Sequence, residues 1–323
     1  MGTNNIFEHI FAEVTLGLLC GWYYFLIFLI YPALLYYIFI EKSIIAGSIT
    51  ALLITLSLIP LQHQPWKGFM NSWIFRIWCD YFDYTTDVSA CAPLKKDRKY
   101  MFCEFPHGVF PMGEFLSVYK VEECFPGETI CGTGADIVFA FPIMRHVMSW
   151  LGTRRASRKG IKNILDSNQH MAIIPGGIAE MYLVSEEEEA IYLRKRQNTV
   201  KVALEEGLDI IPTFFFGTSK ILKLVGGKVK KEKENGNDSD TSLLAKISRK
   251  FRVSILLFYG KYFLPVPIQH PISMVCGAAI EVQQDTNPSP EKIQALLDQL
   301  IKAVEELYAT KKPDWEKRPL VIY

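Results

Sequence analysis

The sequence predicts an α/β protein in which a largely parallel mixed sheet is flanked by helices and preceded by a hydrophobic helical hairpin in the membrane. Two long uncharged stretches near the N-terminus predict the hairpin. Strand-like and helix-like segments alternate from Lys99 onward, which predicts a parallel sheet covered on both faces. An amphipathic segment at 289–308 predicts a long final helix that packs on this sheet.

Residues 1–66 are predicted to form the membrane hairpin, with helices at about 14–40 and 43–62. The first stretch has 27 residues without a charge, and only Glu41 and Lys42 separate it from the second. A helix needs about 20 apolar residues to cross a bilayer. Both stretches are therefore long enough to lie in a membrane.

The short break in the hairpin places its two outer ends on the same side of the bilayer. Glu8 and Glu13 precede the hairpin, whereas Lys67 and Arg76 follow it. Because positive flanks favour the cytosolic side, the remainder of the chain is expected to face the cytosol. A hairpin that dips into one leaflet and a hairpin buried in a soluble protein are the alternatives.

Residues 67–98 are predicted to connect the hairpin to the domain at the membrane interface. Aromatic residues recur in this segment at Trp73, Phe75, Trp78 and Tyr81. Since aromatic rings favour the headgroup zone, we expect an interfacial helix near 69–82. Ordinary helix packing against the domain is the alternative.

Residues 99–323 are predicted to form the cytosol-facing domain. Strands are expected at 100–105, 128–134, 171–177 and 208–217, and helices at 137–150 and 198–206. Residues 226–241 are charged and lack an apolar period, which predicts a flexible insertion. Ser289 caps the final helix and Pro290 occupies its first turn. The apolar stripe of this helix, which is interpreted as core, is Ile293, Leu296, Leu297, Leu300, Ile301, Val304, Leu307 and Tyr308.

Composition and missing motifs exclude several classes of function. The net charge is +1, so no basic surface for nucleic acid is expected. The seven cysteines are scattered without a CxxC pair, so neither a metal site nor a disulfide scaffold is predicted. The sequence has no GxSxG, GxxxxGK[ST] or HExxH motif, and "GTGADI" matches a dinucleotide motif only weakly.

His107 lies between Pro106 and Gly108, where a predicted strand ends. Imidazole titrates near neutral pH and can accept a proton from a hydroxyl group. Gly108 allows a close approach of the backbone to a ligand, and its turn can direct amide N–H groups at an oxyanion. A histidine that only hydrogen-bonds the turn is the alternative.

Further motifs follow His107 in a fixed order. They are a strand with a Pro-Gly-Gly-x-x-Glu turn at 175–180, the basic "LRKR" element at 193–196, and a strand with "P…FG" at 212–217. In this order, and together with the N-terminal hairpin, they resemble the type-2 diacylglycerol acyltransferase family, which includes monoacylglycerol and wax-alcohol acyltransferases. The resemblance covers residues 15–310 and implies a glycerolipid acyltransferase-like fold.

This resemblance implies acyl transfer from acyl-CoA to a lipid hydroxyl group, with acyl-CoA as a co-substrate and no bound cofactor. His107 matches the motif histidine and is expected to act as the general base. Glu180 matches the acid after the double glycine and is expected to orient the imidazole ring. The backbone at Gly108, or at Gly176 and Gly177, is expected to hold the oxyanion.

The sequence departs from related motifs at two positions. Phe105 replaces the first histidine of the HPHG motif of animal members, and Met112 replaces the aspartate of the HxxxxD motif of glycerophosphate acyltransferases. Glu104 and Glu114 are therefore candidates for a second acid. A solvated carboxylate in the first turn of a helix is the alternative for Glu114.

Arginine side chains bind phosphates bidentately, and coenzyme A carries phosphates. Arg158, Arg194 and Arg196 are the candidates for this contact. Their alternative is a basic surface that faces anionic lipid headgroups.

The expected partners are the bilayer, acyl-CoA and diacylglycerol, and a homo-oligomer is a further expectation. The expected location is the endoplasmic reticulum membrane or a lipid droplet, and a plastid envelope stays open. Monoacylglycerol, a long-chain alcohol and a lysophospholipid are alternative acceptors. A non-catalytic lipid-binding protein of membranes or droplets is the alternative outside the enzymes.

Overall fold

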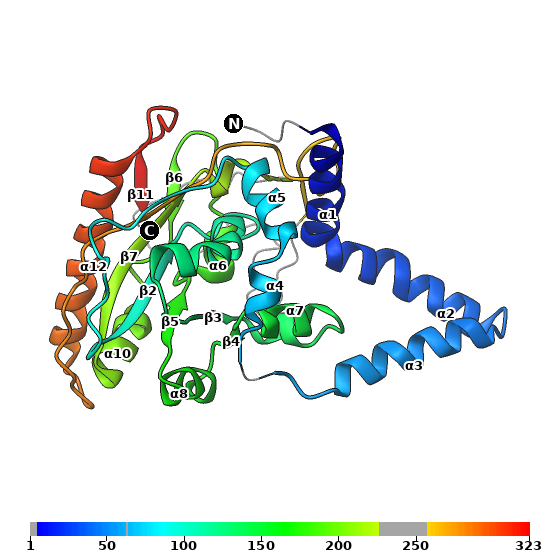
Figure 1. Ribbon diagram of the computed structural model, residues 1–323, viewed down its shortest axis with the longest axis horizontal. Coiled ribbons are helices and arrows are strands. Elements are labelled where there is room, and N and C mark those ends of the chain that lie inside the picture. Colours follow the sequence, from blue (N-terminus) through cyan, green and yellow to red (C-terminus); the bar gives the residue numbers. More distant parts are fainter. Residues whose placement is uncertain (1–4, 63, 226–256) are drawn as a thin grey trace, which may run out of the picture.

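The computed structural model describes residues 5–62, 64–225 and 257–323. A seven-stranded sheet with the order β1-β10-β7-β2-β5-β3-β4 forms the centre of the domain (Figure 1). Its strands are β1 Thr85–Asp87, β2 Lys99–Phe105, β3 Ile130–Gly134, β4 Arg154–Arg155, β5 His170–Ile173, β7 Leu208–Phe216 and β10 Ser273–Cys276. All neighbouring strands are parallel except β10 and β7, which are antiparallel. The predicted class, a largely parallel mixed sheet flanked by helices, is confirmed.

The two central strands, β2 and β7, are buried on both faces, and most of their residues are apolar. They pair in parallel, with Glu104 opposite Thr213 and Phe105 opposite Phe214. Side chains alternate along β2, so that Phe102 joins one hydrophobic cluster and Cys103 joins the other. Each face of the sheet therefore has its own core.

Three helices cover the Cys103 face of the sheet: α8 Arg158–Asp166, α10 Gln197–Glu206 and α12 Pro290–Lys311. Ser289 caps α12, because its hydroxyl oxygen accepts a hydrogen bond from the backbone N–H of Lys292 at 3.3 Å. Apart from the partly buried Ile293, the predicted apolar stripe of α12 is buried in the core. Gly207 ends α10 in the left-handed region with a φ of 68°.

Other helices cover the Phe102 face. The main ones are α1 Ile6–Tyr24, α5 Trp73–Tyr81 and α6 Met112–Cys124, with the shorter α4 Lys67–Met70 and α7 Met144–Trp150 beside them (Figure 1). The predicted helix at 137–150 is divided into the 3₁₀ turn η2 Asp136–Phe139 and α7. In α5 the predicted aromatic residues Phe75, Trp78 and Tyr81 are buried, whereas Trp73 is exposed. Most of this segment thus packs on the domain, as the alternative interpretation expected.

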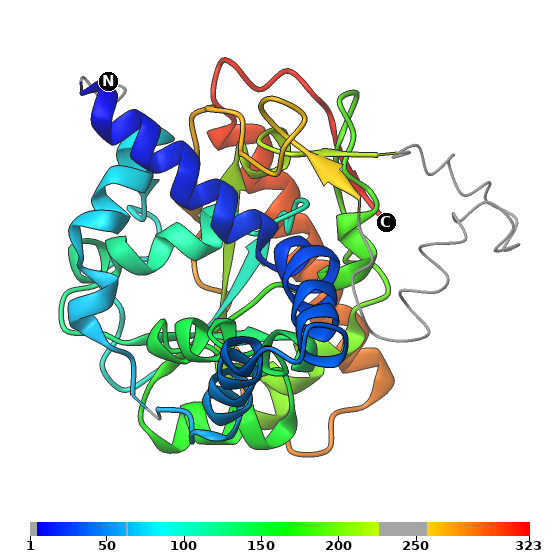
Figure 2. The ribbon, with the colours of Figure 1, turned by 90° about the vertical axis from the view of Figure 1, so that its right-hand side faces the viewer.

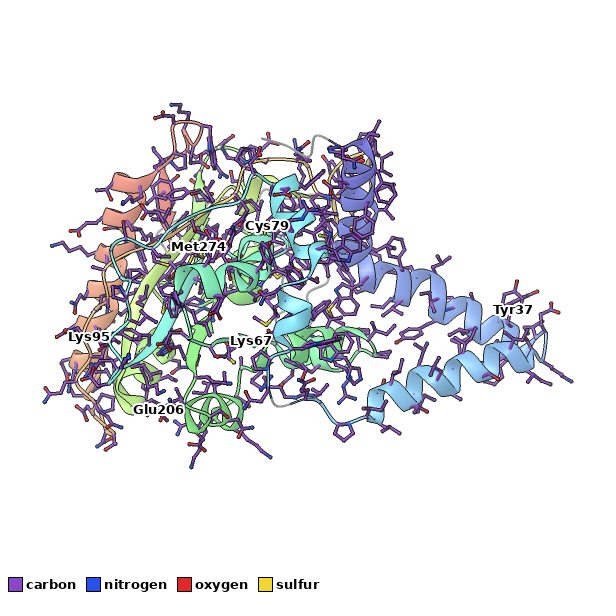
Figure 3. The ribbon with its side chains drawn as sticks, in the orientation of Figure 1. Tyr37, Lys67, Cys79, Lys95, Glu206 and Met274 are labelled. Carbon is purple, nitrogen blue, oxygen red and sulfur yellow. The ribbon has the colours of Figure 1, made fainter. Side chains whose placement is uncertain are left out.

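One continuous helical segment, Ile6–Phe39, opens the chain and is long and apolar enough to cross a membrane. It comprises α1, the π-helical segment η1 Phe25–Ile30 and α2 Tyr31–Phe39. Pro32 lies in the first turn of α2, and because it lacks an N–H it cannot continue the α-helical bonding. The shorter apolar helix α3 Ile44–Leu58 follows, and the two form a hairpin that projects from the domain, with Tyr37 near its far end (Figures 1 and 3).

The predicted start of the first helix, near residue 14, is corrected by the structure. The helix begins at Ile6, and α1 lies across the domain (Figure 2). Its Thr15 hydroxyl oxygen accepts a hydrogen bond from Trp78 Nε1 at 2.8 Å, and Glu8 pairs with Arg76 at 2.8 Å. Within the described ranges, the elements that project beyond the domain are η1, α2 and α3.

The C-terminal strand β11 Leu320–Ile322 pairs in parallel with β6 Glu189–Ile191. Arg318 donates hydrogen bonds to Glu189 and Glu316, and all three side chains are buried. A third, two-stranded sheet joins β8 Lys223–Leu224 to β9 Phe258–Tyr259. The predicted insertion at 226–241 lies outside the described residues.

Candidate active site

His107 and the double-glycine turn lie at the same edge of the sheet. His107 follows β2, and Gly176 and Gly177 follow β5. The two strands are parallel neighbours, with Cys103 opposite Ile173. Because the carboxyl ends of parallel strands meet at one edge, the sequence brings these two turns together.

Glu180 connects the two turns through the backbone. It lies on the short helix α9 Gly177–Met181 and is 1% exposed. Its Oε1 accepts a hydrogen bond from the backbone N–H of His107 at 2.5 Å, and its Oε2 accepts one from the N–H of Tyr192 at 2.9 Å. Burial raises the pKa of Glu180 to about 7, although both backbone N–H groups favour the charged form. A Cβ atom on Gly176 would lie 1.9 Å from Oε2, so the carboxylate occupies the space that this glycine leaves.

The His107 ring is held by the carbonyl group of the next residue. Nδ1 lies 3.1 Å from the backbone oxygen of Gly108. Since a carbonyl oxygen only accepts hydrogen bonds, Nδ1 carries the hydrogen and Nε2 is left with a free lone pair. Burial lowers the pKa of His107, which keeps the ring neutral. The expected contact between Glu180 and the ring is not made: Gly108 orients the ring, and Glu180 holds the backbone of the turn.

A cavity of about 830 Å³ opens beside His107 and has the volume of a site for a large ligand. Its wall is mostly apolar, with contributions from β2, α6, η2 and α7. Trp22 and Tyr24 from α1 and Ile27 and Phe28 from η1 also line it. The cavity therefore extends from His107 to the base of the projecting hairpin.

Two further carboxyl groups, Glu104 and Glu114, line this cavity. Burial raises the pKa of Glu104 to about 8, and burial together with the Glu104 charge raises the pKa of Glu114 well above its usual range. Both groups are therefore neutral carboxylic acids near pH 7. Glu114 is buried, in contrast to the solvated alternative, and both acids line the same cavity as His107. Their role as a second acid stays a prediction.

The three predicted arginines lie in different environments. Arg196 lines the cavity, donates a hydrogen bond to the Gly176 carbonyl oxygen at 2.5 Å and stacks on the Tyr192 ring. Arg194 donates to the Ile322 carbonyl oxygen at 2.9 Å on the surface. The side chain of Arg158 is 88% exposed and faces Glu205 at 3.7 Å. Neither of these two lines the cavity.

Sequence reasoning missed several parts of the site. Lys195 lines the cavity beside Arg196, and its place in the "LRKR" run was the available signal. Trp22, Tyr24 and Phe28 had no such signal, because only the tertiary packing of the first helix brings them to the cavity. Among the described residues, no three His, Cys, Asp or Glu side chains are grouped in a way that could hold a metal ion.

The sequence of this chain is similar to the sequences of known acyltransferases. Residues 36–321 match the family described as diacylglycerol acyltransferase. The chain is 25% identical over 257 residues to diacylglycerol O-acyltransferase 2 of Dictyostelium discoideum, covering 75% of this chain and 74% of the relative. It is 26% identical over 263 residues to 2-acylglycerol O-acyltransferase 1 of Bos taurus, covering 78% and 77%. The crystal structure of the 1-acyl-sn-glycerophosphate acyltransferase of Thermotoga maritima aligns over 96% of this chain and all of that chain, with 10% identity and a TM-score of 0.43.

The family match spans most of the chain, including the His107 turn, the double-glycine turn and the basic element. The expected resemblance is confirmed. The chain is an acyltransferase and belongs to the diacylglycerol acyltransferase family.

Proposed function

We propose that this protein transfers an acyl group from acyl-CoA to the free hydroxyl group of diacylglycerol and so makes triacylglycerol. One observation carries the proposal: a single cavity connects His107 to the base of the apolar hairpin. Diacylglycerol dissolves in the bilayer, whereas the coenzyme A group is soluble in water. A cavity between an apolar hairpin and a polar turn suits both substrates.

In the proposed mechanism, His107 Nε2 accepts the hydroxyl proton while the acceptor oxygen attacks the thioester carbon. Backbone N–H groups near Gly108, or near Gly176 and Gly177, stabilise the resulting oxyanion. The C–S bond then breaks and coenzyme A leaves as a thiolate, which takes the proton from the imidazolium directly or through water. General-base catalysis of this kind contributes about 10²–10⁴ in rate.

Basic side chains are proposed to bind the phosphates of coenzyme A. Arg196 and Lys195 are the best placed, because both line the cavity beside the double-glycine turn. Arg194 and Arg158 lie on the surface, where they suit a phosphate that extends out of the cavity or an anionic headgroup. If an Arg194→Ala variant binds coenzyme A as tightly as the wild type, Arg194 does not bind the coenzyme A phosphates.

The proposed location is the endoplasmic reticulum membrane or a lipid droplet, with the domain facing the cytosol. The apolar helix Ile6–Phe39 supports membrane association, and Lys67 after the hairpin supports the cytosolic side. A homo-oligomer stays a prediction. Monoacylglycerol is the second candidate acceptor, favoured by the similarity to a 2-acylglycerol O-acyltransferase.

Expression in a yeast strain that lacks neutral-lipid synthesis tests the proposal. Lipid extracts should contain new triacylglycerol, and microsomes should incorporate labelled acyl-CoA into it. Accumulation of wax esters alone would replace diacylglycerol with a long-chain alcohol as the acceptor. No labelled product from any acceptor, at normal protein levels, would refute the proposed activity.

A further inference from the structure

Glu104 and Glu114 share one wall of the cavity, although they come from different elements. Glu104 is the sixth residue of β2 and lies on the same face of the strand as Phe102, which also lines the cavity. Glu114 lies in the first turn of α6, whose next residue, Phe115, is another lining residue. The two are 9% and 8% exposed.

Among the described residues, the carboxyl group of Glu114 has no hydrogen-bond partner, and no basic side chain acts on either acid. Both oxygens of Glu114 are buried without a hydrogen-bond partner. The charged groups that act on Glu114 are Glu104 and Glu180, both acids. Desolvation is the cause of the pKa shift of Glu104, and no basic side chain offsets it.

Other buried carboxylates in this protein are satisfied. Glu180 accepts two backbone N–H groups, and Glu189 accepts hydrogen bonds from Arg318 and Ser219. An unpaired buried carboxyl group costs stability. The unpaired Glu114 carboxyl group, with the second buried acid Glu104 on the wall of the same apolar cavity, indicates that a ligand supplies the missing partner.

The missing partner must accept a hydrogen bond from a carboxylic acid, and it can also donate one. A neutral carboxylic acid donates one hydrogen bond through its O–H and accepts others through its oxygens. The ester carbonyl oxygens of a partial glyceride accept hydrogen bonds, and a second free hydroxyl group, where present, donates one. A long-chain alcohol offers only the hydroxyl group that reacts at His107.

We propose that Glu104 and Glu114 form a subsite that binds the glycerol-backbone oxygens of the acyl acceptor and selects partial glycerides over simple long-chain alcohols. This inference rests on the proposed function, because it takes His107 as the point of reaction. Phe102 and Phe115 provide apolar walls on which the hydrocarbon next to those oxygens can pack.

Acceptor competition tests the subsite. Detergent-solubilised full-length enzyme is assayed with labelled acyl-CoA and either dioleoylglycerol or hexadecanol, and the ratio of the two kcat/KM values is measured. Glu114→Leu and Glu104→Leu should each lower the glyceride-to-alcohol ratio about tenfold to hundredfold, since each removes a buried hydrogen-bonding partner of the glyceride. Glu114→Gln should keep a ratio near that of the wild type, because an amide also donates and accepts.

Glu123→Leu is the matched control, since Glu123 is an exposed glutamate of the same helix, and its ratio should not change. Ratios that stay at the wild-type value in both cavity leucine variants overturn the subsite. Should Glu114→Leu fail to accumulate, the ratio of Glu104→Leu decides the question. Binding of the same two lipids, measured as a shift in melting temperature, provides a readout without turnover. If the wild-type enzyme acylates neither lipid but binds the glyceride, and Glu114→Leu does not bind it, the proposed function is refuted and the subsite is retained. If the wild type and Glu114→Leu bind the glyceride equally well, the subsite is overturned.

Discussion

At His107, one hydrogen bond decides which ring nitrogen can take a proton. The Gly108 carbonyl oxygen occupies Nδ1, so Nε2 is available to a substrate hydroxyl. The ring needs no carboxylate partner for this, and burial alone keeps it neutral. This differs from a triad, in which an acid binds the second nitrogen of the histidine.

The pH dependence of kcat/KM follows from the state of this ring. A protonated imidazole cannot act as a base, so activity falls as the pH drops through the pKa of His107. Because burial lowers this pKa below 6.5, the limb that belongs to His107 should lie below pH 6.5. The measurement is kcat/KM against pH, with a saturated second substrate, in the Glu180→Gln variant, where the Glu180 carboxyl group, whose pKa is about 7, no longer titrates. An acid limb above pH 6.5 in that variant would contradict a His107 ring that is neutral near pH 7.

Glu180→Gln should weaken the hydrogen bonds that hold the backbone of the His107 turn in place. It removes no group that is proposed to touch the substrate. A glutamine has one acceptor oxygen for two N–H donors, so its NH₂ group would face one of them. The free energy of unfolding should fall by about 1–3 kcal/mol. The kcat should also fall, whereas the KM for acyl-CoA should stay nearly unchanged. Glu187→Gln, an exposed change nearby, is the control. Equal kcat values for both variants would show that Glu180 does not position His107.

At the scale of elements, the double-glycine turn requires its two glycines for different reasons. Gly176 has an ordinary φ of −61°, but a Cβ atom there would clash with Glu180. Gly177 has a φ of 52°, but no atom lies within 4 Å of its would-be Cβ. One position therefore lacks space, and the other requires a left-handed backbone.

Alanine substitutions should separate these two effects. Gly177→Ala should cost about 1–2 kcal/mol of backbone strain and leave much of the activity. Gly176→Ala should displace the Glu180 carboxylate and reduce kcat much as Glu180→Gln does. The check is kcat and melting temperature for both variants. A Gly176→Ala enzyme with more activity than Gly177→Ala would contradict the packing of Glu180 against Gly176.

Sequence patterns within single segments predicted most elements of the domain. They could not predict contacts between segments that are far apart in the sequence. The apolar runs of β2 and β7 and the stripe of α12 are periodic within one segment, so the sequence reveals them. The position of α1 depends on contacts such as that between Thr15 and Trp78, 63 residues apart. The role of Glu180 was predicted for the same turn but assigned to the wrong partner, because no pattern distinguishes a ring nitrogen from a backbone N–H.

At the scale of the whole molecule, the hairpin is expected to hold the cavity at the bilayer. Leu52 and Ile54 are exposed apolar residues near the middle of α3. Each arginine placed there should cost about 2.5–3.5 kcal/mol of membrane insertion. The double variant Leu52→Arg/Ile54→Arg should therefore be released from microsomes by alkaline carbonate more readily than the wild type.

Ile40→Arg is the matched control for this experiment, because Ile40 is exposed next to the charged residues at the tip of the hairpin. It should stay with the membrane if the hairpin spans the bilayer, since the tip then reaches the opposite headgroups. Release of Ile40→Arg to the same extent would favour a hairpin that dips into one leaflet. Retention of the double variant at the wild-type level would contradict a membrane-embedded α3.

The most direct test of the central claim is the turnover of His107→Ala in microsomes supplied with labelled acyl-CoA and diacylglycerol. The proposed mechanism predicts that kcat falls about 10²–10⁴-fold at normal protein levels. The KM for acyl-CoA should change little, because His107 is not proposed to bind coenzyme A. Wild-type turnover by His107→Ala would contradict a general base at this position.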